Sequence, residues 1–139
     1  MPDLPIVSLP VVLVVEDHPI VRFNAVSLVN QAGYEAVGAI HADDAIRILE
    51  ERTDIKVVFT DIEMPGTMDG MKLAHYVRER WPPIHLLIAS GRMTPNECLL
   101  PANTRFFSKP YDDTTIVAEL KRLLTKPADN LPEIITLTT

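Results

Sequence analysis

One stretch near the middle of the chain, Val57-Val58-Phe59-Thr60-Asp61, restricts the possible fold more than any other. Consecutive β-branched and aromatic apolar residues are typical of a strand that is buried on both faces, as strands of parallel sheets are. The lone carboxylate of Asp61 ends this run, and Pro65-Gly66 marks a loop just beyond it. Open parallel α/β sheets bind ligands at the carboxyl edge of their strands, so Asp61 is predicted to lie where a ligand binds.

The bulk composition narrows the class of protein. With 139 residues, 47% of them apolar, the chain fits one domain with one core. Its net charge of −6 and the lack of any Lys and Arg cluster argue against direct nucleic-acid binding. The single cysteine, Cys98, excludes an internal disulfide, no apolar run approaches the roughly 20 residues of a membrane span, and no basic signal-peptide start is present. We therefore expect a cytoplasmic protein with no membrane insertion.

Apolar runs alternate with helical patterns along the chain. Strands are expected at residues 11–15, 34–40, 55–60, 84–89 and 104–108. Helices are expected at residues 19–32, 42–52, 69–81 and from 112–113 to 124. The first helix takes its pattern from apolar residues at Ile20, Val21, Phe23, Val26, Leu28 and Val29. The alternation predicts a doubly wound α/β fold, a five-stranded parallel sheet with helices on both faces.

The connection between the fourth and fifth strands departs from this regularity. It runs from Gly91 to Thr104 and is interrupted by Pro95 and Pro101. Proline removes a helical hydrogen bond, so a fourth helix of one or two turns at most is expected there. We also expect residues 1–10 to be an N-terminal extension, 11–125 the folded domain and 126–139 an irregular tail.

Polar side chains follow four of the predicted strands where each strand ends: Glu16, Asp17, Asp61, Ser90 and Lys109. Parallel strands bring their carboxyl ends to one edge, so these side chains are expected to share a pocket. Gathered carboxylates repel one another, and Mg²⁺ would relieve that repulsion. A carboxylate, a metal, a lysine and a hydroxyl are the parts of a phosphoryl-transfer site in which Asp61 is the nucleophile.

Five motifs in this order resemble the receiver domain of the two-component response regulators. The likeness runs from about Val11 to Leu124, and its motifs are Val14-Val15-Glu16-Asp17, Thr60-Asp61, Met64-Pro65 with Asp69-Gly70, Ser90-Gly91, and Lys109-Pro110. Each motif alone is weak, but together they are specific. The resemblance implies a flavodoxin-like sheet in the order 2-1-3-4-5 and a single-domain regulator similar to chemotaxis regulators.

The resemblance also implies how the site works. Asp61 would accept a phosphoryl group from a histidine kinase or a histidine phosphotransfer protein. Asp17, Asp61 and the backbone carbonyl of Glu63 would bind Mg²⁺ directly, and Glu16 would assist through water.

Further roles follow from the same resemblance. Lys109 would pair with the phosphoryl group, and its bond to Pro110 would be cis. Ser90 would swing toward the phosphoryl group, while Phe106 would be the aromatic switch that turns inward. The protein would then signal by binding a downstream protein, so it is expected to be a signalling protein rather than an enzyme.

The sequence departs from the family pattern in two places, the short 91–104 segment and one extra residue, Thr67 or Met68, in the loop after Gly66. The short 91–104 segment stands where the family has its fourth helix, which is part of the family's usual signalling face. Spacing also suggests a hypothesis that Glu63 and Arg92 pair across the mouth of the site and tune the access of water.

Three other functions use the same elements. A metal-dependent phosphatase with an aspartyl nucleophile would carry a second aspartate two residues later, where this chain has Glu63. A flavodoxin-like nucleotide or flavin binder would need a Gly/Ser/Thr-rich loop after the first strand, where Glu16-Asp17 would repel phosphate. The third alternative is a receiver-like module that binds its partner without being phosphorylated.

Overall fold

The computed structural model describes residues 9–66, 68–94 and 99–124 as five strands and four helices. The strands are β1 (Val11–Val15), β2 (Glu35–Ala39), β3 (Ile55–Asp61), β4 (His85–Ser90) and β5 (Thr104–Ser108). The helices are α1 (Pro19–Gln31), α2 (Ala42–Glu51), α3 (Gly70–Arg80) and a last helix over 113–124. All strand pairs are parallel, in the order β2-β1-β3-β4-β5. The predicted fold class and strand order are confirmed.

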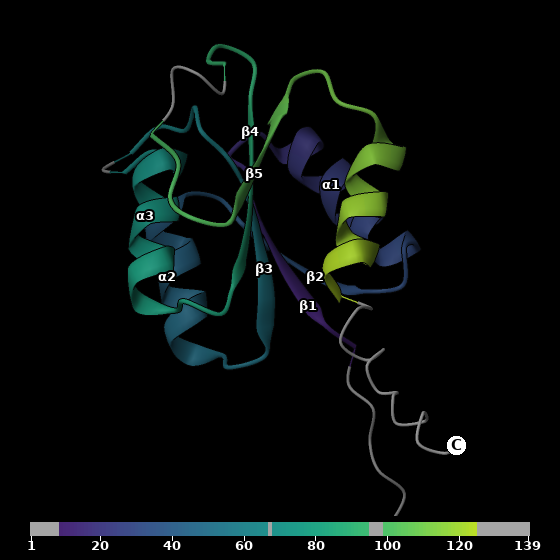
Figure 1. Cartoon of the computed structure of the whole chain (residues 1–139), viewed down its shortest axis with the longest axis horizontal. Coiled ribbons are helices and arrows are strands. Elements are labelled where there is room, and N and C mark those ends of the chain that lie inside the picture. The colour runs from purple at the N-terminus through teal and green to yellow at the C-terminus, as the bar shows by residue number, and fades with distance from the viewer. Residues whose placement is uncertain (1–8, 67, 95–98, 125–139) are drawn as a thin grey trace, which may run out of the picture.

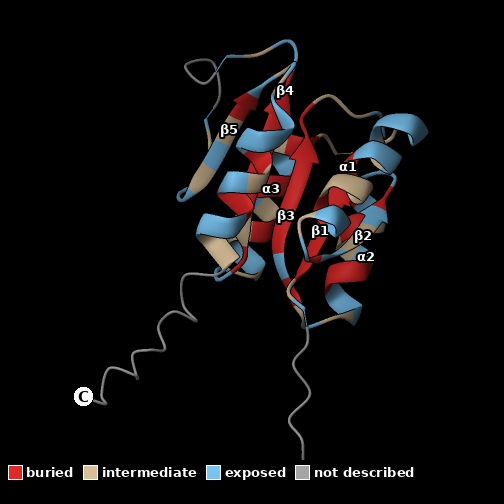
Figure 2. Ribbon diagram, turned by 90° about the vertical axis from the view of Figure 1, so that its right-hand side faces the viewer, coloured by how far each residue is buried: buried red, intermediate tan, exposed pale blue. Residues whose placement is uncertain are grey.

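Two helical layers cover the sheet, α1 and the last helix on one face and α2 and α3 on the other (Figure 1). Each face has its own apolar cluster. Leu13, Leu73 and Ile88 belong to the cluster under α2 and α3, and Val14 and Leu120 to the cluster under α1 and the last helix. The core is therefore divided by the sheet, which is buried along most of its length (Figure 2).

The central strands are uniformly apolar because both of their faces are covered. All five residues of β1 are at most 1% exposed. Alternate residues supply the two clusters, with Leu13 on one side and Val12 and Val14 on the other. This is the burial that the continuous apolar runs predicted.

The expected element boundaries hold to within a residue or two. β1 and β5 begin and end where predicted, while β4 lies one residue later at both ends. The helix α3 ends at Arg80, before the Pro82-Pro83 pair that was predicted to stop it. No helix of the described residues is long and apolar enough to cross a membrane.

The first helix forms, but part of its apolar pattern does not face the core. Ile20 and Phe23 are 64% and 68% exposed, and the buried residues of α1 are Ala25 and Val29. The small Ala25 packs on the sheet, and the expected pattern missed it because that pattern was based on larger apolar residues.

Arg78 of α3 contacts the connection from β4 to β5 through its guanidinium. The Arg78 guanidinium donates to the carbonyl oxygens of Ala102 at 2.9 Å and Asn103 at 3.3 Å, and to those of Pro82 and Ile84 at 2.6 and 2.8 Å. Residues 91–94 and 99–103 contain no helix. Residues 95–98 lie outside the described residues, so the expectation of at most one or two turns in this connection stays a prediction. Most of the N-terminal extension and the tail also lie outside the described residues.

Candidate functional site

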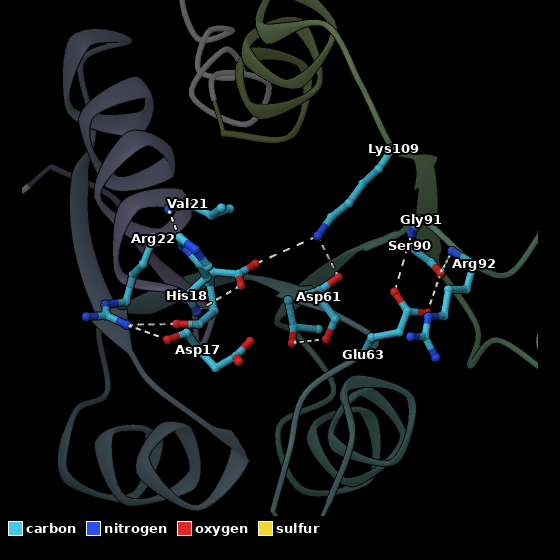
Figure 3. Close-up of polar contacts among 12 residues, drawn as sticks. Asp17, His18, Val21, Arg22, Asp61, Glu63, Ser90, Gly91, Arg92 and Lys109 are labelled. Atoms are coloured by element: carbon cyan, nitrogen blue, oxygen red, sulfur yellow. Dashed lines mark hydrogen bonds and ion pairs between the residues drawn. The ribbon is translucent and has the colours of Figure 1, made fainter.

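The carboxyl ends of four strands meet at one edge of the sheet and bring the predicted polar residues together (Figure 3). Strand register sets their positions, because β1 and β3 pair Val15 with Thr60, the residues just before Glu16 and Asp61. The backbone pairing extends past the strand ends, where the Lys109 amide donates to the Ser90 carbonyl at 2.9 Å. The polar residues that were predicted to meet therefore lie at one edge of the sheet, and their roles in catalysis and metal binding stay predictions.

Lys109 is the cation of the site. Its Nζ lies 2.9 Å from Asp61 Oδ1 and 3.9 Å from Glu16 Oε1, and it reaches them from the end of β5. Asp61 and Glu16 are buried, with 7% and 6% of their surface exposed. The low exposure strengthens these ion pairs, because water screens them little.

Three carboxylates form a candidate metal centre. Glu16, Asp17 and Asp61 each offer an oxygen, and these atoms lie within 4.8 Å of one another. Asp61 Oδ1 is buried and accepts no well-aligned hydrogen bond from the described residues, although Lys109 lies close to it. A buried carboxylate oxygen without such a partner suits a hard cation, so the donor set fits Mg²⁺.

Burial and mutual repulsion disfavour the charged forms of the carboxylates in the site. Burial raises the pKa of Asp61, the charges of Glu63 and Asp17 add to this rise, and Lys109 partly offsets it. Burial also raises the pKa of Glu16, assisted by the charges of Asp61 and Asp17. For Lys109 burial disfavours the charged form, but the carboxylates of Asp61 and Glu16 outweigh it and raise the pKa. An added cation would relieve the crowding of carboxylates.

Ser90 is held by Glu63 rather than pointing freely into the site. Its Oγ donates to Glu63 Oε2 at 2.6 Å and accepts from the backbone amides of Arg92 and Met93 at 3.1 and 2.9 Å. The Gly91 amide also donates to the Glu63 carboxylate, at 3.3 Å. The hypothesis of a Glu63–Arg92 ion pair is corrected, since no ion pair joins these two described residues and Glu63 instead accepts from Ser90 and Gly91. An effect of Glu63 on the access of water stays a prediction.

The loop after Asp61 brings the start of α3 back against the end of β3. Asp69 caps α3 by accepting from the Lys72 amide at 2.9 Å, and the Gly70 amide donates to the Ile62 carbonyl, also at 2.9 Å. A Cβ at position 70 would overlap the Asp61 carbonyl oxygen, so only glycine permits this approach. The extra residue expected in this loop involves position 67, which lies outside the described residues.

The two phenylalanines of β5 lie on opposite faces of the sheet. Phe107 is buried against the cluster under α1 and the last helix, and Phe106 is half-buried on the α2 and α3 side. One of the pair was expected to be core, and Phe107 is. The expected cis bond between Lys109 and Pro110 is present, and the switching role of Phe106 stays a prediction.

One residue that contacts the acidic loop was not singled out from the sequence. Arg22, on the first turns of α1, donates from Nη1 to the Glu16 carbonyl at 3.0 Å and to the Asp17 carbonyl at 3.4 Å. A lone arginine in an amphipathic helix resembles any surface charge. Its position five residues after Asp17 was the only available signal.

Comparisons with known proteins agree with this geometry. The family model described as "Response regulator receiver domain" matches residues 12–121. The sensor kinase CckA of Brucella abortus is 31% identical over 119 residues, which cover 83% of this chain and 12% of the kinase. The chain spans a quarter or less of the first curated relatives it matches.

Solved structures share the fold. A response regulator receiver domain protein from Clostridium thermocellum aligns with a TM-score of 0.79 at 21% identity, covering 88% of this chain and all of that one. The regulator TrrA of Thermotoga maritima, solved in complex with Mg²⁺-BeF, aligns with a TM-score of 0.73 at 23% identity, covering 82% of this chain and 98% of that one. Receiver domains are signalling domains rather than classical enzymes. With the family match across most of its length and its strand order, the chain belongs to the response regulator receiver domain family.

Proposed function

We propose that this protein accepts a phosphoryl group on Asp61 from a phosphohistidine of a histidine kinase or histidine phosphotransfer protein, in the presence of Mg²⁺. One observation carries the proposal. Asp61 lies buried at the end of β3, 2.9 Å from the Lys109 ammonium and within a cluster of three carboxylates. A buried aspartate with a metal site on one side and a lysine on the other suits the nucleophile of phosphoryl transfer.

The chemistry assigned to Asp61 is an in-line displacement. A carboxylate oxygen of Asp61 forms a bond to phosphorus as the bond from phosphorus to the donor's imidazole nitrogen breaks. The bonding electron pair returns to the imidazole, and the product is an acyl phosphate on Asp61. Asp17, Asp61 and the Glu63 carbonyl would hold Mg²⁺ with Glu16 assisting, and the ion would supply positive charge for the phosphoryl oxygens.

Two side chains of this chain take part directly. Lys109 moves its charge from the Asp61 carboxylate to a phosphoryl oxygen, since its Nζ already lies beside Oδ1. Ser90 donates to a second oxygen, for which it must leave Glu63 Oε2. Phosphorylation thereby breaks a contact between the β3–α3 loop and the end of β4.

The consequence of this rearrangement is a change in partner binding. We assign the protein to a stand-alone role, in which the phosphorylated surface binds a downstream protein or passes the phosphoryl group on. We assign the response to the 91–104 segment, whose residues 91–94 directly follow Ser90, and to Phe106 on the neighbouring strand β5. We place this activity in the cytoplasm, where histidine kinases present their phosphohistidine.

The direct test is the mass of the intact chain after incubation with acetyl phosphate and Mg²⁺. We expect the wild-type chain to gain one phosphoryl group and Asp61→Asn to gain none. The Asp54→Asn variant is a matched control, because Asp54 precedes β3 at its other end, where it pairs with Arg52 at 2.7 Å. No gain in the wild-type chain, or the same gain in Asp61→Asn, would contradict the proposal and favour a module that binds without phosphorylation.

A further inference from the structure

The β1–α1 loop carries two of the three clustered carboxylates, and Arg22 holds its backbone. The Nη1 group of Arg22 donates to the Glu16 carbonyl at 3.0 Å and the Asp17 carbonyl at 3.4 Å. Both contacts are partly buried, and they join consecutive peptide groups, so the guanidinium constrains the direction in which each peptide faces.

A second set of contacts constrains the same loop from within. The His18 amide donates to Glu16 Oε2 at 3.1 Å, and His18 Nδ1 accepts from the Val21 amide at 3.4 Å as the cap of α1. The Arg22 amide donates to the His18 carbonyl at 2.9 Å, so backbone and side chain of Arg22 both contact the loop. The side-chain contacts of Arg22 thus add to these local bonds and to the bond from the Glu16 amide to the Ala39 carbonyl, at 3.0 Å, at the start of the loop.

The stem of Arg22 lies against the backbone of β2 at Gly38. A Cβ built at Gly38 would lie 3.3 Å from Arg22 Cδ and 3.5 Å from Cγ. Gly38 pairs with Val14 in the sheet, two residues before Glu16. The missing side chain at position 38 therefore leaves the space through which Arg22 reaches the loop.

Arg22 contacts the loop from the side opposite to the other site residues. Figure 3 shows Arg22 beside α1, with the Asp17 carboxylate pointing away from it toward Asp61. Because the carbonyl oxygens face the guanidinium, the side chains of the same residues are left to converge on Asp61.

We infer that Arg22 is a positioning residue for the divalent-cation site, holding the Glu16 and Asp17 peptide groups so that their carboxylates meet that of Asp61. The inference rests on the proposed binding of Mg²⁺. The inference also predicts the direction in which Arg22 changes the affinity for the cation. As a nearby positive charge alone, Arg22 would weaken cation binding, whereas as a positioning group it strengthens binding.

The test is the dissociation constant for Mg²⁺ alone, measured by calorimetric titration of the full chain. We expect Arg22→Gln to weaken binding about 10-fold, the lower end of the range for residues that orient metal ligands. Arg22→Lys keeps the charge but not the geometry and should also bind more weakly than wild type. Gly38→Val, which alters no charged group, should weaken binding in the same direction by displacing the Arg22 stem. Arg47→Gln, an exposed arginine on α2, is the control and should leave binding unchanged.

The melting temperature of each variant in EDTA separates binding from folding. Unchanged or tighter Mg²⁺ binding by Arg22→Gln would overturn the inference, even if its melting temperature falls, because Arg22 would then be structural only. If Arg22→Gln does not fold, Gly38→Val decides by the same criterion. Absence of Mg²⁺ binding by the wild-type chain would instead refute the metal in the proposed function, and the inference with it.

Discussion

At the scale of single residues, Ser90 has the most informative environment. Its hydroxyl is shared among Glu63 and two backbone amides, so it already has partners before any phosphoryl group is present. The sequence located Ser90 at the pocket but did not identify Glu63 as its partner. These residues are 27 positions apart, and only the course of two loops brings them together.

Glu63→Ala should therefore accelerate phosphorylation of Asp61. The variant releases Ser90 and removes a charge that helps to raise the pKa of Asp61. A hydrogen bond to a charged group contributes about 1.5–3 kcal/mol, which is equivalent to about 10- to 150-fold in rate, and this range is the upper bound on the expected increase. The measurement is the time course of the intact mass with acetyl phosphate. Glu63→Gln, which keeps an acceptor for Ser90, should lie between the two, and equal rates in all three chains would show that the contact does not oppose the reaction.

At the scale of elements, side chains of α3 hold the β4–β5 connection in place. Arg78 reaches four carbonyl oxygens, two in the α3–β4 turn and two in 102–103, and His75 Nε2 lies 2.6 Å from the Leu99 carbonyl oxygen. Burial lowers the pKa of Arg78, because it disfavours the charged form of the guanidinium. Residues 99–103 of this connection are thus hydrogen-bonded to side chains of α3.

Arg78→Met should destabilise the fold. The substitution keeps the apolar stem but leaves several carbonyl groups with only water or no partner, at a cost of about 1–3 kcal/mol in the free energy of unfolding. Urea unfolding followed by circular dichroism measures this. The Arg47→Met control loses only exposed ion pairs on α2 and should change the free energy by less than about 1 kcal/mol. Equal effects in the two variants would mean that the Arg78 contacts add nothing beyond a surface charge.

Much of the element scale was predictable from sequence. The buried strands read correctly because both faces of β1 and β3 must be apolar, which leaves continuous runs such as Val11–Val15. The Arg78 contacts were not predictable, since an arginine at the end of an amphipathic helix has the same local sequence whether it faces water or a loop. The exposed Ile20 and Phe23 were missed for a related reason: periodicity identifies the helix, but contacts decide which of its residues are buried.

At the scale of the whole molecule, the apolar core stabilises the fold, whereas the buried carboxylates of the site destabilise it when they are charged. Two apolar clusters flank the sheet and supply the core, while the acidic edge gathers buried carboxylates whose pKa values are raised. A group with a raised carboxyl pKa binds its proton more tightly in the folded state. Its stabilising effect is present near the ordinary carboxyl pKa of about 4 and is lost as the pH rises through the raised value.

Glu16→Gln should consequently stabilise the protein at neutral pH in EDTA. Glutamine retains an acceptor for the His18 amide but removes the charge, so the difference in melting temperature between variant and wild type should grow from pH 4 toward pH 7. Calorimetry at several pH values measures it. Mg²⁺ should raise the melting temperature of the wild-type chain more than that of the variant. The exposed Glu79→Gln on α3 is the control, and a difference that shrinks with rising pH would contradict the prediction.

The alignment of Val15 with Thr60 has one more consequence. Because adjacent side chains alternate between the faces of a sheet, a slip of one residue between β1 and β3 would separate Glu16 and Asp17 from Asp61 while leaving both strands apolar. Apolar burial alone therefore discriminates poorly against the slipped pairing. The proposed binding of a divalent cation would discriminate, because it needs all three carboxylates together, and it would therefore report which chains have folded in the native register.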